Sequence, residues 1–407
     1  MAGHPVRAVA AGGPQGGRAV TAPGIDAPAP GRFWTAAVVG SGVTIAAGVL
    51  AGVDRAWAAW LVTSLYVLGL GLGGLFFIAL LYVTGSSWGV ALRRVPEAMT
   101  AALPAAGLAV LALLLVRPGA YPWTHGADHE AGALAAFKSV WLSYPFFLAR
   151  AVAYVGLWVV LARALVARSR RQDDDADPAH SARNVRLSAG GLVVFAVTVS
   201  LASFDWIMSL EPDWYSTMFG IYQFAGLFQS ALAAIIVAVV WLGRRGPLRL
   251  VVSRDHLHDL GKLLFAFSTF WMYIWFSQYM LIWYANLPEE TVYYVIRTHG
   301  AWEVLFLLNM LLNWAVPFFV LLRRPPKQRP EILVKVAAVV LVGRWLDLYL
   351  MIVPTQAGPT PPFGVWEIAS LACVAGASIV VVLHALRRAP IVPLNDPWLA
   401  RSLHYHS

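Results

Sequence analysis

A few ionisable side chains interrupt the long apolar runs of this sequence, and they are its first candidates for chemistry. The set comprises Arg150, Asp205, Glu303, Arg344, Asp347 and Glu367, with His299 and Lys262 at the ends of such runs. Ionisable groups at membrane depth are costly and commonly mark proton or substrate pathways. His299 and Glu303 are four residues apart, so one helix face would carry both as a proton-accepting pair. With Asp205 they predict a proton relay; the alternative for this pair is a helix-start cap beside an interfacial histidine.

Arg344 and Asp347 are three residues apart, which favours a structural role instead. Neighbours on a helix face can pair and so neutralise each other's charge in a medium of low dielectric constant. Arg150 falls near the middle of its apolar run and needs a carboxylate, a carbonyl or a water-filled cavity. No sequence rule identifies that partner.

An unusually aromatic run, residues 260–286, offers a second kind of chemistry. It contains Trp271, Trp275, Gln278 and Tyr279. An aromatic wall with a hydrogen-bonding amide suits a flat quinone ring, so these residues predict a quinone-like pocket. The alternative is that the aromatic side chains pack only against the core and lipid.

Metal and haem ligands are scarce. The single cysteine, Cys373, lies in an apolar run, so the sequence offers no covalent haem attachment and no thiolate cluster. The segment 121–130 carries two histidines and two carboxylates, but their spacing fits no zinc template, and a polar loop or partner contact is the alternative. Intrinsic haem is not expected, because His299 and His384 fall at opposite ends of their spans.

The elements that must position these residues are membrane-spanning helices. Of the 407 residues, 59% are hydrophobic and 13% are charged, which excludes an ordinary soluble domain. Apolar runs of about 20 residues recur, the length that crosses a bilayer as a helix. We predict ten spans, at about 33–52, 57–83, 98–116, 138–166, 186–208, 216–242, 260–286, 299–322, 332–353 and 364–386.

Basic residues fix the expected orientation. Most Lys and Arg residues fall in the tail, in the even-numbered connections and after the last span, whereas the opposite connections hold Arg55, Arg117, Lys138 and Arg297. The positive-inside rule then places both termini in the cytoplasm and most of the buried charge toward the other face. The net charge of +9 reflects this asymmetry and contact with anionic lipid rather than a nucleic-acid surface.

The chain divides into three parts on this interpretation. Residues 1–31 form a disordered cytoplasmic tail rich in Gly, Ala and Pro, and residues 387–407 form a cytoplasmic C-terminal segment. The membrane domain, residues 32–386, contains a solvated cytoplasmic linker at about 167–185, where arginines precede a run of aspartates. Glycines at 69, 71, 73 and 74 predict close helix packing within the second span.

Two motifs carry a resemblance to a known family. The first is SFDWIMSLEPDWYSTMFG at 203–220; the second is HDLGK at 258–262, leading into FWMYIWFSQYMLIWYAN at 270–286. Together they resemble the NrfD-like membrane subunits of alternative complex III, most closely subunits of the ActF type. The resemblance covers the chain from about the first span to the tenth.

This resemblance implies both a fold and a setting. The fold would be all-α and NrfD-like, with ten transmembrane helices in two four-helix bundles plus two peripheral helices. The setting would be a quinol:cytochrome c (or high-potential carrier) oxidoreductase of the bacterial inner membrane. Its expected partners are a sister NrfD-like subunit, an iron–sulfur subunit, haem c subunits and a terminal oxidase, with the iron–sulfur clusters and haem on those partners. Quinone or quinol would be the non-covalent cofactor.

Two other functions stay open at this point. One is a structural membrane anchor of the same complex, without quinone or proton chemistry of its own. The other is a secondary transporter, which would require broken helices in matching halves. Pro104, Pro145 and Pro317 fall inside predicted spans, but they do not form such a pair.

Overall fold

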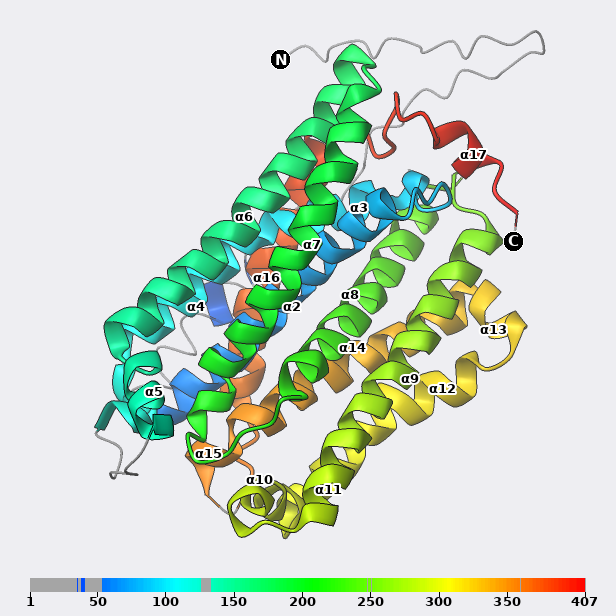
Figure 1. Ribbon diagram of the computed structural model, residues 1–407. Helices are drawn as coiled ribbons and strands as arrows, with labels where there is room; N and C mark the ends of the chain where they lie inside the picture. Colours follow the sequence, from blue (N-terminus) through cyan, green and yellow to red (C-terminus); the bar gives the residue numbers. More distant parts are fainter. Residues whose placement is uncertain are drawn as a thin grey trace, which may run out of the picture.

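The computed structural model describes residues 35, 38–40, 53–125, 133–246, 248–249, 251–358 and 360–406, and every regular element in these ranges is helical (Figure 1). The long helices are α2 (Val53–Val83), α4 (Leu103–Val116), α6 (Tyr144–Asp175), α7 (Ala179–Trp206), α8 (Phe219–Arg244), α9 (Arg254–Ala285), α14 (Pro330–Ile352) and α16 (Val365–Arg387). The shorter helices are α3 (Arg94–Met99), α5 (Ala133–Trp141), α10 (Pro288–Thr298), α11 (Ala301–Met310), α12 (Val316–Leu321), α13 (Arg324–Gln328), α15 (Pro354–Ala357) and α17 (Leu399–Leu403).

Seven helical stretches in the described residues are long and apolar enough to cross a membrane. They are Val53–Val83, Val90–Val116, Tyr144–Asp175, Ala179–Leu210, Phe219–Arg244, Ala301–Leu321 and Val365–Arg387. The chain is therefore a multi-pass, all-α membrane protein. Helices α9 and α14 are also long, but α9 is rich in Trp and Tyr and α14 carries Lys335, Arg344 and Asp347, so both are less apolar. Most of the first predicted span, 33–52, lies outside the described residues.

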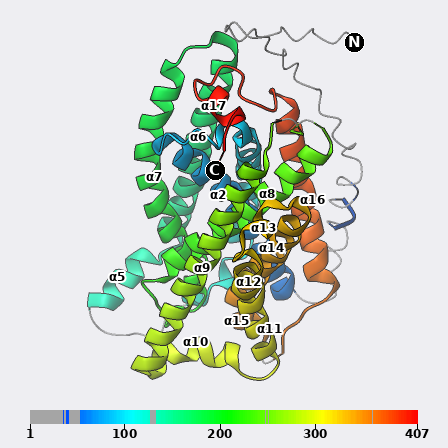
Figure 2. The same ribbon diagram turned by 90° about the vertical axis from the view of Figure 1, so that its right-hand side faces the viewer.

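Contacts between elements divide the long helices into two groups. Helices α2, α4, α6 and α7 pack together as the first group, and α8, α9, α14 and the α11–α12 segment pack together as the second. Extensive packing of α2 against α8 joins the groups, and α16 packs against α2 and α3. One end of the molecule carries the α6–α7 connection and α17; we call it the C-terminal face. The other end carries α10 and the turn at 207–218; we call it the opposite face (Figures 1 and 2).

Small residues allow α2 to lie at the centre of this arrangement. A Cβ atom added at Gly73 would collide with Ala231 of α8, and one added at Gly71 would lie 2.8 Å from the Leu103 side chain. At Gly74 the nearest atom would be the Pro96 carbonyl oxygen, at 3.0 Å. The prediction of close helix packing at these glycines is thus confirmed, whereas Gly69 has ordinary space around it.

The segment predicted as a solvated linker at 167–185 is helical, so that part of the prediction is wrong. Helix α6 continues to Asp175 and α7 begins at Ala179. Ala176 takes a left-handed conformation, with φ of 56°, where the chain reverses. Across the turn, Ser181 donates to Gln172 at 3.0 Å and the His180 ring lies 2.7 Å from Asp175. Arg and Gln favour helices even where no apolar face exists, which explains the extension beyond the membrane.

The C-terminal segment is docked onto the bundle by a buried ion-pair network. Asp396 forms an ion pair with Arg93 at 2.8 Å, and the neighbouring Arg94 pairs with Glu97 at 2.5 Å and also with Asp173 of α6. Asp173 in turn accepts from the backbone N–H of Leu394 at 3.1 Å. Arg93 and Arg94, which the sequence pattern indicates only as part of a basic connection, therefore hold this connection, α6 and the C-terminal segment together at the C-terminal face.

Candidate functional site

Asp347 of α14 is the most highly connected buried carboxylate of the second helix group. It is 1% exposed and lies about one helical turn from the end of α14 at the opposite face. Its Oδ1 accepts from Asn309 Nδ2 at 2.9 Å and from the Tyr222 hydroxyl. Its Oδ2 accepts from Arg344 Nη1 at 2.5 Å and from Trp271 Nε1 at 3.3 Å. Four helices therefore converge on one carboxylate: α8, α9, α11 and α14.

The Arg344–Asp347 ion pair expected from the sequence is present, but it belongs to this larger network. Arg344 Nη2 also donates to Gln223 Oε1 at 2.7 Å. The guanidinium passes over Gly226 of α8, where a Cβ atom would collide with it. A glycine is thus needed at this position because the arginine lies directly on the helix surface.

A row of polar side chains continues from Asp347 into the middle of the bundle. Asn313 Nδ2 donates to Asn309 Oδ1 at 2.7 Å, and Gln229 Nε2 donates both to the Asn313 carbonyl at 2.6 Å and to Ser268 Oγ at 3.1 Å. We call Asp347, Asn309, Asn313, Gln229 and Ser268 the polar ladder. The side-chain oxygens Gln229 Oε1 and Asn313 Oδ1 are buried and have no hydrogen-bond partner within the described residues.

Local backbone chemistry explains why the ladder forms here. Pro317 has no backbone N–H, so the carbonyl of Asn313, four residues earlier, lacks its usual α-helical donor. The helix widens into a π-helical stretch at Leu311–Ala315, and Gln229 supplies a donor to the free carbonyl. By contrast, Pro104 and Pro145 occupy the first turns of α4 and α6, where proline disrupts no bond.

The ladder reaches only half of the membrane thickness. Ser268 lies near the middle of α9, and the buried residues of α9 between it and Asp259 are Leu264, Gly261 and Leu260. Within the described residues, the buried face of α9 therefore continues the ladder's polarity toward the opposite face but is apolar between Ser268 and Asp259, on the way to the C-terminal face. Because the ladder reaches only one face, its side chains alone do not form a polar path from one face of the bundle to the other.

The residues expected to form a quinone-like pocket lie next to Asp347. Trp271, Trp275 and Tyr279 project from one face of α9 as a stack, with ring centroids 6.2 and 5.8 Å apart. Trp275 and Gln278 line a small cavity of about 20 Å³ that Asp347 also lines, which has room for about one water molecule. The amide of Gln278 already has partners, because its Nε2 donates to the Tyr294 hydroxyl at 3.0 Å and its Oε1 accepts from Ser216 at 3.1 Å.

Arg297 forms the wall of this cavity that is nearest to the opposite face. Its guanidinium donates to the carbonyls of Leu350 and Met351 at 2.7 and 3.1 Å, which satisfies the C-terminal end of α14. It also pairs with Glu211, in the turn at 207–218, at 2.6 Å. Glu211 is only half-buried, so the cavity ends at a group in reach of solvent.

Asp205 is the centre of a separate network in the first helix group, and it provides the partner that Arg150 requires. Arg150 Nε and Nη2 donate to the two carboxylate oxygens of Asp205 at 2.9 and 2.8 Å. The Tyr154 hydroxyl and Trp141 Nε1 each add a hydrogen bond of 2.9 Å. The Trp141 ring lies 4.0 Å from the guanidinium carbon of Arg150. Asp205 is thus fully paired by rigid neighbours.

The structure does not bring Asp205 together with His299 and Glu303. No hydrogen bond or ion pair links these three residues in the described part of the chain, and His299 and Glu303 are both exposed. The expectation that the latter two share one helix face is wrong. His299 is extended at the end of α10, and Gly300, with φ of 64°, separates it from α11, which carries Glu303.

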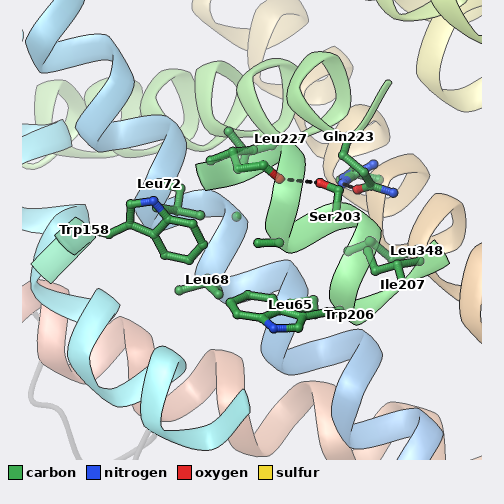
Figure 3. Close-up of a pocket in the computed structure, with 14 residues that line it drawn as sticks. Leu65, Leu68, Leu72, Trp158, Ser203, Trp206, Ile207, Gln223, Leu227 and Leu348 are labelled. Carbon is green, nitrogen blue, oxygen red and sulfur yellow. Dashed lines mark hydrogen bonds between the residues drawn. The ribbon is translucent and has the colours of Figure 1, made fainter. Parts of the chain in front are cut away.

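A second cavity, of about 50 Å³, lies between the two helix groups (Figure 3). Trp158, Ser203 and Trp206 line it from the first group, and Gln223 and Arg344 line it from the second. Ser203 donates to its own helix, to the Val199 carbonyl at 2.6 Å, and Trp206 Nε1 is buried without a hydrogen-bond partner in the described residues. The cavity brings the surroundings of Asp205 and Asp347 close together without joining them by hydrogen bonds.

Metal binding finds no support in the described ranges. No group of three or more His, Cys, Asp or Glu residues there could hold a metal ion. Of the histidine- and carboxylate-bearing segment at 121–130, residues 126–130 lie outside the described residues.

Sequence reasoning missed the polar groups that are not ionisable. Asn309 and Asn313 are four residues apart within an apolar run, and Gln223 and Gln229 fall in another. Amide side chains in lipid are costly unless they are hydrogen-bonded, so two of them at i, i+4 in an apolar run were a usable signal of a buried polar network. Tyr222 and Tyr294 gave no such signal, because tyrosines are common at membrane interfaces.

Comparisons with known proteins leave the family open. No protein family model matches the chain, and no curated protein matches it.

Proposed function

We propose that this chain is an integral membrane subunit of a quinol-oxidising electron-transfer complex of the alternative complex III type. The motifs at 203–220 and 258–286 carry the resemblance on which this proposal rests. Two packed groups of four long helical segments and a peripheral α16 support the NrfD-like arrangement with ten spans. The basic side chains near the C-terminal face support cytoplasmic termini in a bacterial inner membrane.

Within that complex, we assign the chain a proton path rather than an electron path. The observation that carries this role is the polar ladder, which leads from mid-membrane to a buried carboxylate beside an aromatic cavity. Amide and hydroxyl side chains can relay protons through ordered water, and the two unpaired oxygens of Gln229 and Asn313 are acceptors for such water. Protons would then leave past Arg297 and Glu211 at the outer side.

This proposal moves the proton-accepting role from Asp205 to Asp347. Asp205 is held by Arg150, Tyr154 and Trp141, and among the described residues no hydrogen bond links these donors to a further buried polar side chain. Asp347 also pairs with an arginine, but its other three bonds come from the neutral groups Asn309, Tyr222 and Trp271, and Asn309 continues into the polar ladder. His299 and Glu303 are exposed at the opposite face and would act only as acceptors near the surface.

Quinone stays the proposed non-covalent ligand on the strength of the resemblance, and its headgroup would have to displace side chains beside Asp347, because the cavity there holds about one water molecule. Trp275 offers an aromatic face, and Gln278 and Tyr294 offer polar atoms. Haem c and the iron–sulfur clusters would belong to partner subunits, together with a sister NrfD-like subunit that contacts the iron–sulfur chain. The alternative function is a structural anchor, in which the same network only stabilises the fold.

Asp347→Asn in the purified complex separates these functions. Asparagine keeps the size and a hydrogen-bonding oxygen but cannot take up a proton at physiological pH. We expect quinol turnover per haem c to fall by about 10²-fold, the lower end of the contribution of a positioned proton-transferring side chain. The matched control is Glu367→Gln, because Glu367 is equally buried and paired with Arg55 at 2.9 Å but lies outside the ladder.

The outcome decides between a proton path and an anchor. If the assembled Asp347→Asn complex oxidises quinol at the wild-type rate, the proton path is wrong and the anchor remains. A second variant, Asn313→Leu, interrupts the ladder without touching the carboxylate. It should slow turnover while leaving the amount of quinone bound per complex unchanged.

A further inference from the structure

A long apolar groove lies on the membrane-facing side of the bundle, apart from the polar ladder. It has a volume of about 570 Å³ and runs between α8 and α16, over a floor formed by α2, α3 and α14. Small side chains such as Ala234, Ala238 and Ala375 leave the space, and the exposed Ile379 marks its open side. Within the described residues, from which 41–52 are excluded, the groove is therefore open toward the lipid phase.

The groove has the length of one lipid leaflet. Its lining residues on α8 extend from Ala234 to Arg245, and those on α16 extend from Ala375 to Leu386. At ~1.5 Å per residue each wall is about 16 Å long, close to half of the ~30 Å hydrocarbon thickness. Both walls end at the C-terminal face, so the groove occupies the leaflet on that side.

Polarity is confined to the end of the groove at the membrane surface. Arg245 lines this end, exposed, with its guanidinium carbon 5.6 Å from the centre of the Trp241 ring. No carboxylate pairs with Arg245 among the described residues, whereas the adjacent Arg244 lies 3.6 Å from Glu331. An arginine and a tryptophan at the headgroup level, above an apolar channel, match the polarity of an anionic phospholipid.

The described part of the first apolar segment lies against a different side of α16. A Cβ atom at Gly40 would lie 2.7 Å from the Ala369 carbonyl oxygen and 2.9 Å from Cys373 Cβ. Cys373 and Ala375 are two residues apart, about 200° around the helix, so they face opposite ways. Residue 40 therefore does not occupy the groove.

We infer that this groove is a binding site for one anionic phospholipid, with an acyl chain lying between α8 and α16 and the phosphate against Arg245. The apolar walls would bury the acyl chain and so protect it from exchange with other lipids of the same leaflet. Arg245 would provide the preference for a negative headgroup. The site is independent of the proposed proton path, because no residue of the polar ladder lines it.

The test uses native mass spectrometry of the full chain in detergent, titrated with phosphatidylglycerol or phosphatidylcholine. We expect one tightly retained phospholipid and a preference for phosphatidylglycerol. Arg245→Gln should weaken phosphatidylglycerol binding about fivefold, the factor for ~1 kcal/mol per arginine near an anionic lipid surface, and leave phosphatidylcholine binding unchanged. Arg186→Gln is the control, because Arg186 is exposed near the same face on α7.

Blocking the groove tests the acyl-chain part of the site. Ala238→Phe should abolish retention of both lipids, and Ala375→Phe, from the opposite wall, should do the same. Ala153→Phe is the matched control, since Ala153 is an exposed alanine of α6 away from the groove. Equal lipid retention by the blocked variants and the control would overturn the assignment. So would retention of an isoprenoid quinone in place of a phospholipid.

Discussion

Replacing Arg150 by methionine should strongly destabilise the first helix group. The substitution keeps most of the apolar side-chain volume but leaves the Asp205 carboxylate, 1% exposed, without its cation. Of the four side-chain hydrogen bonds to this carboxylate, the two from Arg150 disappear and those from Tyr154 and Trp141 remain. Loss of one partner of a buried ion pair costs about 3–5 kcal/mol, and the two remaining donors favour the lower end, about 3 kcal/mol.

The assay is equilibrium unfolding of the purified chain in mixed detergent micelles, followed by tryptophan fluorescence. Arg244→Met is the matched control, because the Arg244–Glu331 pair is exposed and 3.6 Å long and should contribute only about 0–1 kcal/mol. Adding Asp205→Leu to Arg150→Met removes the unpaired charge and should restore at least half of the lost stability. Equal unfolding free energies for the Arg150 and Arg244 variants would refute the idea that Asp205 is a structural centre.

Two further predictions concern the second helix group and the C-terminal face. Gly226→Ala should displace the Arg344 guanidinium and lower stability by about 1–3 kcal/mol, whereas Gly243→Ala, also in α8, has free space and should be neutral or stabilising, as measured by the same unfolding assay. His256 precedes the predicted span at 260–286, and burial lowers the pKa of its imidazole below the ordinary value of 6.5. Because the unfolded chain then binds the proton more readily, the contribution of His256 to stability should be fully present above pH 6.5 and decrease as the pH falls below 6.5. His256→Gln should remove this part of the pH dependence of stability. A pH profile of stability identical to that of the wild type would contradict the prediction.

The apolar pattern was sufficient to predict where the helices lie. Each predicted span after the first overlaps a helix in the described residues. The reason is that a helix satisfies the backbone hydrogen bonds of an apolar run of about 20 residues within lipid. The pattern was poor at helix ends. Helix α6 continues well past 166, since the charged sequence that follows is compatible with a helix in water. Hydropathy reports where the membrane ends and not where the hydrogen-bonded helix ends.

Contacts between side chains that are far apart in the sequence could not be predicted from the sequence alone. Arg344 and Asp347 are neighbours on one helix, so their spacing alone predicted contact. Arg150 and Asp205 are 55 residues apart, and their contact depends on how α6 and α7 pack. His299 and Glu303 illustrate the opposite error, because their spacing was favourable but Gly300 interrupts the helix between them.

The distribution of buried polarity in the second helix group argues for proton release on one side rather than transfer across the membrane. Side chains from Asp347 to Ser268 form a hydrogen-bonded row, but the buried positions of α9 beyond Ser268 are Leu264, Gly261 and Leu260 until Asp259. A path through this chain alone would have to pass that apolar layer, where a charged species is unfavourable. Under the proposed function, the ladder would therefore receive protons at mid-membrane depth and deliver them to the opposite face. On this argument, a polar residue at Leu264 should be needed before any proton could enter the ladder from the C-terminal face.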